Sequence, residues 1–252
     1  LLILACVDFV YRSRTRALSR VAAAHSLAGL VTIALSSLVA IGILIEPRMV
    51  SWTVLGIGPA VLAVLMAYLV GVRLIYVDQQ ASQQAHEAEA SGGSRRLSLR
   101  VALLGYLIAV VAVFLAAPML AASAGHIAEL SGLGETFIGV TLLALTTSLP
   151  ELVVAVTAVR RGSLSLAVGD ILGGNSYDLL ILVLLDAVYR EGTIYSAVGP
   201  AEMAWVVLSI VLVSTLMLGL LRRQKHGVGN VGFETVLMLA LYAGGVAAIT
   251  LS

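Results

Sequence analysis

The amino-acid sequence predicts an all-α, polytopic membrane protein, on the evidence of its composition and its hydropathy pattern. Hydrophobic residues make up 60% of the 252-residue chain and charged residues only 12%, whereas soluble domains are closer to half apolar and a quarter charged. The apolar residues form long runs, which are typical of membrane-spanning helices and unlike the short alternating strands of an outer-membrane barrel. The net charge of +1 gives no indication of nucleic-acid binding.

Hydropathy divides the chain into one short apolar segment, 1–11, and about seven segments that are long enough to cross a bilayer. These predicted spans are 22–45, 55–77, 101–124, 134–159, 163–188, 201–221 and 232–251. Residues 78–99 join the second and third of them and are rich in Gln, Ala, Glu, Ser and Gly. That composition predicts a mobile loop without a domain of its own.

The distribution of Lys and Arg predicts the orientation of the spans. Basic residues gather in the loop 12–21, around the linker 78–99, in the turn at Arg160-Arg161 and in the loop before the last span, whereas the opposite side carries only Arg48 and Arg190. The positive-inside rule therefore predicts that the Arg-rich loops and the linker are cytoplasmic and that the C-terminus lies outside. The predicted location is the bilayer of a bacterial inner membrane.

The predicted span 134–159 carries a carboxylate, Glu151, in an apolar setting directly after Pro150. A carboxylate is costly within a membrane, so the first hypothesis is that it handles an ion or a proton. Pro150 has no N–H for the carbonyl of Thr146, which loosens that turn. Thr147, Ser148 and Glu151 share one helix face, and their oxygens are donors that suit Ca²⁺ or Na⁺.

The following span carries a second carboxylate, Asp178, with Asn175 one turn before it on the same face. Gly173 and Gly174 precede them and would let another backbone come close. Two antiparallel helices, one with Glu151 and one with Asp178, could place both carboxylates around one cation. Asp170, earlier in this span, is interpreted as a helix cap or turn residue.

The stretch 131–189 resembles the second α-repeat of the cation/Ca²⁺ exchanger superfamily, which includes Na⁺/Ca²⁺ exchangers. The family pattern GTSLPE, a basic turn and GN-x-x-GSN-x-F-N/D is matched here by TTSLPE (146–151), Arg160-Arg161-Gly162 and GDILGGNSYD (169–178). The departures are Thr146 for Gly, Asp170 for Asn, Gly174 for Ser and Tyr177 for Phe. The resemblance implies an inverted-repeat exchanger fold that binds its ion near mid-membrane. The implied cation ligands are Glu151, Asp178, Thr147, Ser148 and Asn175.

An internal repeat supports this fold class. Leu1–Arg12 (LLILACVDFVYR) and Leu179–Arg190 (LLILVLLDAVYR) are identical at eight of twelve positions, at an offset of 178 residues. Arg12 is predicted inside and its equivalent Arg190 outside, so the two repeats are inverted, as in many secondary transporters. Asp8 with Arg12, and Asp186 with Arg190, are spaced i, i+4 and are interpreted as interfacial ion pairs.

The repeat offset places the counterpart of Asp178 immediately before Leu1. We therefore expect the chain to be a fragment that lacks most of the first α-repeat, which would be needed to complete the site; the alternative is a natural half-protein that pairs with another chain. The predicted organisation is the remainder of the first repeat at 1–77, a cytoplasmic linker at 78–99 and the second repeat at 100–252.

These observations lead to the hypothesis of a secondary active cation antiporter that exchanges Ca²⁺ for Na⁺ by alternating access. A Ca²⁺/H⁺ exchanger without Na⁺ dependence and a non-transporting membrane scaffold remain alternatives. An intramembrane enzyme with Ser148 as its nucleophile is disfavoured because no histidine lies in mid-span; His25, His86, His126 and His226 are expected at interfaces or in loops. The expected partners are inorganic cations and the lipid bilayer, and no cofactor is expected beyond the transported Ca²⁺, Na⁺ or H⁺.

Overall fold

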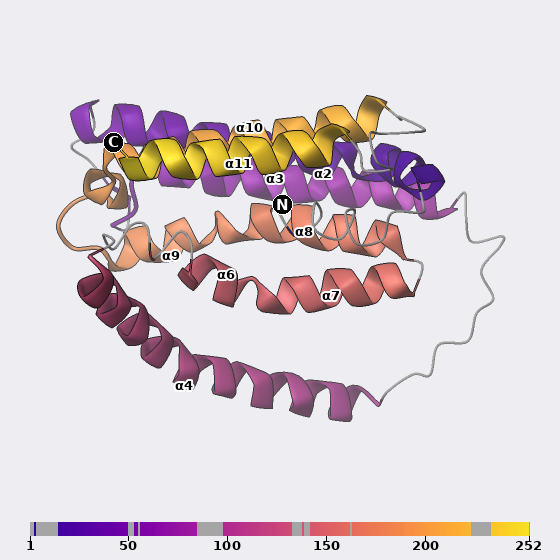
Figure 1. The fold of residues 1–252 in the computed structure, drawn as a ribbon, viewed down its shortest axis with the longest axis horizontal. Coiled ribbons are helices and arrows are strands. Elements are labelled where there is room, and N and C mark those ends of the chain that lie inside the picture. The colour runs from indigo at the N-terminus through magenta and orange to yellow at the C-terminus, as the bar shows by residue number, and fades with distance from the viewer. Residues whose placement is uncertain are drawn as a thin grey trace. The chain divides into compact units, whose positions relative to one another are not determined.

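The computed structural model describes residues 3, 15–49, 53–54, 56–84, 98–132, 138, 142–161, 163–222 and 233–251. Across these residues the chain is helical, apart from connecting turns and one isolated bridge between Val54 and Ile57 (Figure 1). The helices are α2 (Thr15–Met49), α3 (Pro59–Gln84), α4 (Leu99–Ser131), α6 (Ala144–Thr147), α7 (Leu149–Arg160), α8 (Leu164–Asp178), α9 (Ile181–Val188), the 3₁₀ helix η2 (Ile194–Ala197), α10 (Pro200–Arg222) and α11 (Phe233–Leu251). The predicted all-α class is confirmed.

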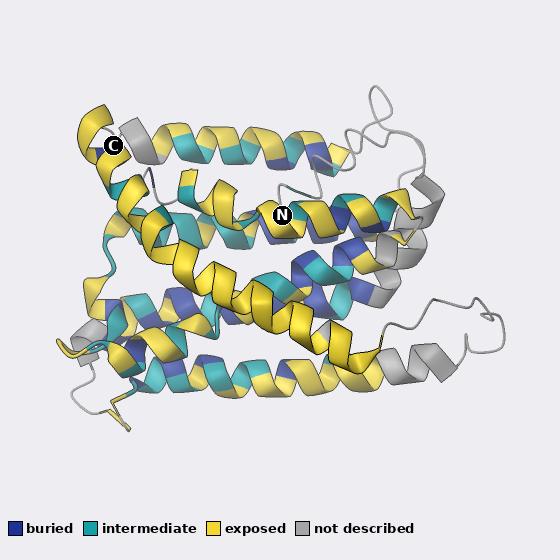
Figure 2. Cartoon of the chain, turned by 90° about the horizontal axis from the view of Figure 1, so that it is seen from below, coloured by how far each residue is buried: buried dark blue, intermediate teal, exposed yellow. Residues whose placement is uncertain are grey.

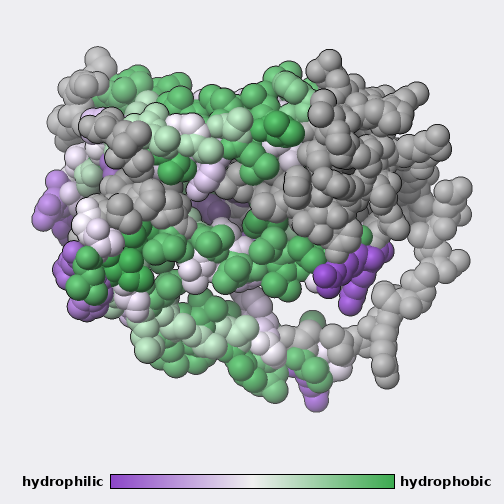
Figure 3. All heavy atoms as spheres, in the orientation of Figure 1, coloured by the Kyte–Doolittle hydropathy of each residue, from purple (hydrophilic) through white to green (hydrophobic). Residues whose placement is uncertain are grey.

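Five of the described helical segments are long and apolar enough to cross a membrane. They are His25–Glu46, Pro59–Asp78, Leu99–Ser131, Leu166–Val188 and Pro200–Leu221, and Phe233–Ala248 is a shorter apolar helix. Hydrophobic residues cover much of the described surface, and hydrophilic ones gather toward the ends of the helices (Figure 3). The chain is therefore an integral membrane protein. Five of the seven predicted spans correspond to these segments, whereas the predicted span 134–159 is interrupted at Ser148 and lies partly outside the described residues, and the predicted span 232–251 corresponds to the shorter helix.

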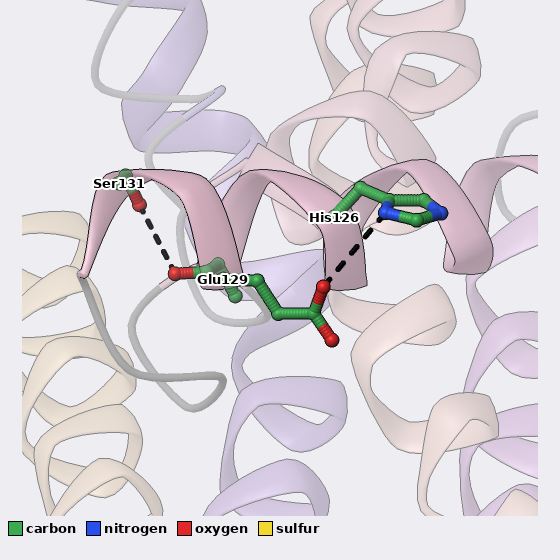
Figure 4. Close-up of polar contacts among 4 residues, drawn as sticks. His126, Glu129 and Ser131 are labelled. Carbon is green, nitrogen blue, oxygen red and sulfur yellow. Dashed lines mark hydrogen bonds and ion pairs between the residues drawn. The ribbon is translucent and has the colours of Figure 1, made fainter.

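The chain forms two compact units, one of residues 1–82 with 151–252 and the other of residues 83–150. In the second unit, α4 is exposed along nearly all of its length (Figure 2). Near its end His126 Nδ1 lies 3.8 Å from Glu129 Oε2, and Ser131 donates a hydrogen bond to the Ala128 carbonyl (Figure 4). Gly132 then stops the helix with a left-handed φ of 69° and an N–H bonded to the Ala128 carbonyl.

The first unit is organised around α2, which packs against α8, α10 and η2, while α11 packs against α10. A main hydrophobic cluster joins α2, α8, α10 and α11; its buried members include Ala28, Leu172, Val213, Leu216 and Met238. A second cluster at Leu35, Val39, Val61, Val64 and Tyr195 joins α2 to α3 and η2. Helices of the predicted first repeat (α2, α3) and second repeat (α8 to α11) therefore share one core.

A polar contact ties α2 to α8 inside this core. The hydroxyls of Thr32 and Ser176 are 2.7 Å apart, and both residues are buried. Thr32 also bonds the carbonyl of Leu172 on α8 at 3.3 Å and that of Ala28 on its own helix at 2.9 Å. Because polar groups in an apolar interior need hydrogen-bond partners, this pair fixes the sliding position of one helix against the other.

The linker begins later than the sequence predicts. Helix α3 continues to Gln84, through the first residues of the predicted loop 78–99. The added segment, DQQASQQ, contains neither Gly nor Pro, and four of its seven residues are Gln, which tolerates the helical conformation well. The rest of the predicted linker up to residue 97 lies outside the described residues.

The Thr32–Ser176 contact predicts a measurable contribution to stability. We expect Thr32→Val, which keeps the shape but removes the hydroxyl, to lower the free energy of unfolding by about 0.5–1.5 kcal/mol. Denaturant unfolding of the complete protein in detergent would measure the change. Ser37→Ala is the matched control, because the Ser37 hydroxyl bonds only its own helix at Ile33; equal losses in both variants would contradict the inter-helix role of Thr32.

Candidate cation-binding site

The helix that precedes Glu151 is interrupted at the motif TTSLPE. Helix α6 ends at Thr147, Ser148 forms a turn, and α7 begins at Leu149. Pro150 supplies the physical cause, because it cannot donate an N–H to the Thr146 carbonyl and its ring pushes against that turn. The loosened turn that the sequence predicts is therefore present.

Thr147 and Ser148 belong to the unit that ends at Pro150 and are described within it. The Thr147 hydroxyl donates to carbonyls of its own helix, at 3.0 Å from Leu143 and 3.1 Å from Ala144. A hydroxyl that donates its hydrogen in this way still has lone pairs to offer a cation. Ser148 is half-buried, and its N–H bonds the Ala144 carbonyl at 3.0 Å. Whether either residue ligates an ion stays a prediction.

Glu151 lies on the same face of α7 as Ala155 and Ala158, one and two turns further on. Both alanines are buried in a cluster with Ala167 of α8. The chain turns back between α7 and α8 within a few residues, so the two helices run antiparallel (Figure 1). This register brings Glu151 opposite the later half of α8.

Two carboxylates of α8 interact electrostatically with Glu151, namely Asp170 and Asp178. They lie eight residues apart on α8, and the antiparallel register places Glu151 opposite the segment between them. The sequence analysis interpreted Asp170 as a cap or turn residue, and this is wrong, because Asp170 lies inside α8. Asp170 is therefore a further carboxylate on α8, but within the described residues it does not converge with Glu151 and Asp178 into a group that could hold a metal ion.

Two polar side chains of α8, Asn175 and Asp170, each have a buried atom that lacks a hydrogen-bond partner. The side-chain Nδ2 of Asn175 and the Oδ2 of Asp170 are buried and have no hydrogen-bond partner among the described residues. Glu151 and Asp178 are exposed. A Cβ added to Gly173 or Gly174 would meet no heavy atom within 4 Å, so the close approach of another backbone that the sequence predicts is not seen in the described residues.

The geometry offers hard oxygen donors but not a closed coordination shell. Within the described residues, no group of three or more His, Cys, Asp or Glu side chains converges closely enough to hold a metal ion. Of the predicted ligands, Glu151 and Asp178 are electrostatic neighbours, and Asn175 stands one turn before Asp178. A cation drawn to these carboxylates would need further oxygens to replace its water.

Sequence reasoning also missed a buried carboxylate cluster elsewhere in the first unit. Asp186 was interpreted as the ion-pair partner of Arg190, but it is fully buried and accepts hydrogen bonds from the backbone N–H groups of Gly58 and Ile194 instead. Glu46, which the sequence analysis did not single out, is buried beside it and accepts from the N–H of Ala60. Its position at the very end of an apolar run, just before a turn, is the one sequence signal that could have marked it.

Comparison with known proteins matches the part of the chain that contains these carboxylates. The family model described as sodium/calcium exchanger protein matches residues 101–251. The inner membrane protein YrbG of Escherichia coli is 34% identical over 117 residues, which is 46% of this chain and 34% of YrbG. The sodium/calcium exchanger MaX1 of Methanosarcina acetivorans is 31% identical over 122 residues, 46% of this chain and 33% of MaX1.

A longer match is to the uncharacterized membrane protein MJ0091 of Methanocaldococcus jannaschii, at 26% identity over 176 residues. It covers 70% of this chain and 54% of that protein. The matched part of this chain thus spans between about a third and about half of the length of these relatives. No solved structure gives a significant match to the chain.

Two glycines of α8 provide a matched pair of substitutions. A Cβ at Gly169 would lie 2.9 Å from Cε1 of His25, which is itself buried, whereas a Cβ at Gly173 would meet nothing. We expect Gly169→Ala to destabilise the protein by about 1–3 kcal/mol through overpacking. We expect Gly173→Ala to be neutral or to stabilise it by up to about 1 kcal/mol, because Ala is the better helix former. Thermal unfolding of the complete protein measures both, and a reversed order would contradict the α2–α8 packing.

Proposed function

Because the chain belongs to the sodium/calcium exchanger protein family, we propose that it supplies the second ion-binding repeat of a secondary active cation antiporter. In this proposal Ca²⁺ binds near mid-membrane to the carboxylates of Glu151 and Asp178 and is exchanged for Na⁺. Thr147, Ser148 and Asn175 contribute further oxygens. The observation that carries the proposal is the place of Glu151 and Asp178 on α7 and α8, two antiparallel helices joined by a short turn, with the chain interrupted at Ser148 just before Glu151.

The chemistry of the donors supports a hard cation. Carboxylate, hydroxyl and carbonyl oxygens suit Ca²⁺ and Na⁺, whereas soft metals prefer sulfur and nitrogen. Helix interruptions at mid-membrane are where secondary transporters expose backbone groups to their ions. Ca²⁺ takes six to eight oxygens, more than this stretch presents on one side, so we propose that the first α-repeat of the complete protein supplies the rest.

Exchange follows if both ions compete for the same carboxylates. One Ca²⁺ and two Na⁺ neutralise the same two negative charges, so a single site that faces each side in turn couples their opposite movements. An empty site with two uncompensated carboxylates is costly in the membrane. Because of this cost, the site rarely reorients across the membrane without a bound cation. The movement of one ion is therefore coupled to the movement of the other, and transport is an exchange and not a leak.

The third carboxylate gives a specific reason to consider H⁺ as the counter-ion instead. Asp170 stands where the family pattern has Asn, and it interacts electrostatically with Glu151. A carboxylate, unlike the amide of Asn, can bind and release a proton. A Ca²⁺/H⁺ exchanger without Na⁺ dependence is therefore the second candidate function.

We propose a bacterial inner membrane as the location, with the Arg-rich loops and the linker in the cytoplasm and the C-terminus outside. The similarity to YrbG, an inner membrane protein, supports the membrane. The asymmetry of Lys and Arg between the two sides supports the orientation.

Replacement of one carboxylate tests the proposed ion site. We expect Glu151→Gln to reduce ⁴⁵Ca²⁺ uptake by the complete protein in proteoliposomes at least about 100-fold, because a neutral amide cannot compensate a divalent cation. Glu202→Gln is the matched control: Glu202 also lies near the start of a helix, but its carboxylate accepts the N–H of Gly199. Uptake near the wild-type level in Glu151→Gln, with the control also active, would refute the assignment.

Separate ion gradients distinguish the two counter-ions. We expect an outward Na⁺ gradient at equal pH to drive ⁴⁵Ca²⁺ uptake, and a pH gradient without Na⁺ to drive little. The opposite result would favour H⁺ exchange, and Asp170→Asn would then be expected to weaken the dependence on pH. If the folded and correctly inserted protein takes up no ⁴⁵Ca²⁺ under either gradient, the result contradicts antiport and favours the non-transporting scaffold.

A further inference from the structure

The predicted span 163–188 is interrupted directly after Asp178. Helix α8 ends at that residue, a two-residue turn follows, and α9 begins at Ile181 (Figure 1). Within the turn the N–H of Leu180 bonds the carbonyl of Tyr177 at 2.8 Å, which is three residues back and not four as in an α-helix. An interrupted helix resists bending and rotation less than a continuous one, so the contacts of its two parts decide where the Asp178 carboxylate lies.

A buried polar contact holds the part before the interruption. Ser176, two residues before Asp178, places its hydroxyl 2.7 Å from that of Thr32 on α2. Both hydroxyls also lie within hydrogen-bond distance of the Leu172 carbonyl, at 3.3 Å for Thr32 and 3.1 Å for Ser176. Thr32 is 2% exposed and Ser176 is 5% exposed. Rotation of α8 about its axis would separate these groups and leave polar atoms unpaired in an apolar interior.

Helix periodicity relates this contact to the direction of the carboxylate. At about 100° per residue, Ser176 and Asp178 point to roughly opposite sides of α8. Asp178 follows Ala167 by eleven residues within α8, which is about three turns, so these two residues share a face. Ala167 packs with Ala155 and Ala158 of α7. The hydrogen bond to α2 therefore keeps Asp178 on the face of α8 that α7 contacts, and α7 carries the other proposed carboxylate ligand.

The part after the interruption is anchored in a similar way. Asp186 of α9 is 0% exposed, and its carboxylate accepts hydrogen bonds from the backbone N–H groups of Gly58 and Ile194, both at 2.6 Å. Gly58 lies just before α3, so it belongs to the predicted first repeat, as α2 does. Asp178 thus lies between two buried polar contacts that tie α8 and α9 to the first repeat.

We propose that Thr32 is a positioning residue for the second repeat: its hydroxyl, which comes from the first repeat, holds α8 in the rotation that presents Asp178 to the cation. This inference rests on the proposed function, in which Asp178 is an ion ligand. Thr32 itself does not bind the ion, because its hydroxyl is already hydrogen-bonded to its own helix and to α8. A ligand that is held in its binding direction loses less conformational entropy when the cation binds, so the affinity is higher.

Loss of the Thr32 hydroxyl has a specific consequence for transport kinetics. Both proposed carboxylate ligands remain, so the exchange cycle still runs, but α8 samples rotations in which Asp178 is turned away from the cation. We therefore expect weaker cation binding with little change in the maximal rate. Groups that orient metal ligands contribute about 10–100-fold to metal affinity. Because Thr32 acts on Asp178 through the helix, we expect an effect at the lower end of that range.

The Ca²⁺ concentration dependence of ⁴⁵Ca²⁺ uptake by the complete protein in proteoliposomes tests this role. We expect Thr32→Val to raise the KM for Ca²⁺ about 10-fold, while the maximal rate per folded protein stays within about twofold of wild type. Thr32→Ser, which restores the hydroxyl, should return the KM to near the wild-type value. The matched control is Thr215→Val, the same change at a buried threonine of α10 whose hydroxyl donates to the Val211 carbonyl of its own helix at 2.8 Å. This control should leave the KM unchanged.

A KM in Thr32→Val no higher than that in Thr215→Val would overturn the positioning role, and so would a Thr32→Ser variant as impaired as Thr32→Val. If Thr32→Val does not fold, Ser176→Ala removes the same contact from the side of α8, and an unaltered KM in that variant counts against the proposal. Uptake that is lost in Glu151→Gln but keeps its KM in Thr32→Val contradicts this inference alone. A wild-type protein without uptake contradicts the proposed function as well.

Discussion

Every carboxylate placed among the apolar helices of this protein has to be compensated locally, and this constraint orders the structure. Ionised side chains lose their hydration inside a bilayer, so each one needs a cation, a proton or a set of hydrogen-bond donors nearby. One set, Glu151, Asp170 and Asp178, is distributed along the antiparallel helices α7 and α8 without converging on one point. Glu46 and Asp186 form another where the turn between α2 and α3 meets α9 and η2.

The two groups meet the constraint in opposite ways. Asp186 is enclosed and accepts hydrogen bonds from two backbone N–H groups, so the folded protein itself compensates this carboxylate. Glu151 and Asp178 are exposed beside Gly173 and Gly174, where an added Cβ would find open space. A site that binds and releases an ion cannot be permanently compensated by the protein, because a satisfied carboxylate has no reason to take a cation from water. In the proposed function, the incomplete compensation of Glu151 and Asp178 is what leaves them able to bind a cation.

The sequence predicted what depends on local chemistry. Five of the spans follow from hydropathy, and the interruption at Ser148 follows from Pro150. The joint binding of a cation by Glu151 and Asp178 stays a prediction. The role of Asp186 could not be predicted, since its partners are backbone N–H groups at Gly58 and Ile194, and such donors leave no mark in the sequence. Asp170 was assigned to a cap or turn because Asp is common at helix ends. The structure places it in the interior of α8, which begins at Leu164.

If transport proceeds by the proposed alternating access, the contacts between the predicted repeats bear on which helices are able to move. Thr32 of α2 is hydrogen-bonded to Ser176 and Leu172 of α8, and Gly58 before α3 is hydrogen-bonded to Asp186 of α9. A sliding motion between these helices would break buried polar contacts at two separate places, and each break would leave polar groups without partners in an apolar interior. The helices α2, α3, α8 and α9 are therefore suited to a fixed scaffold that holds Asp178.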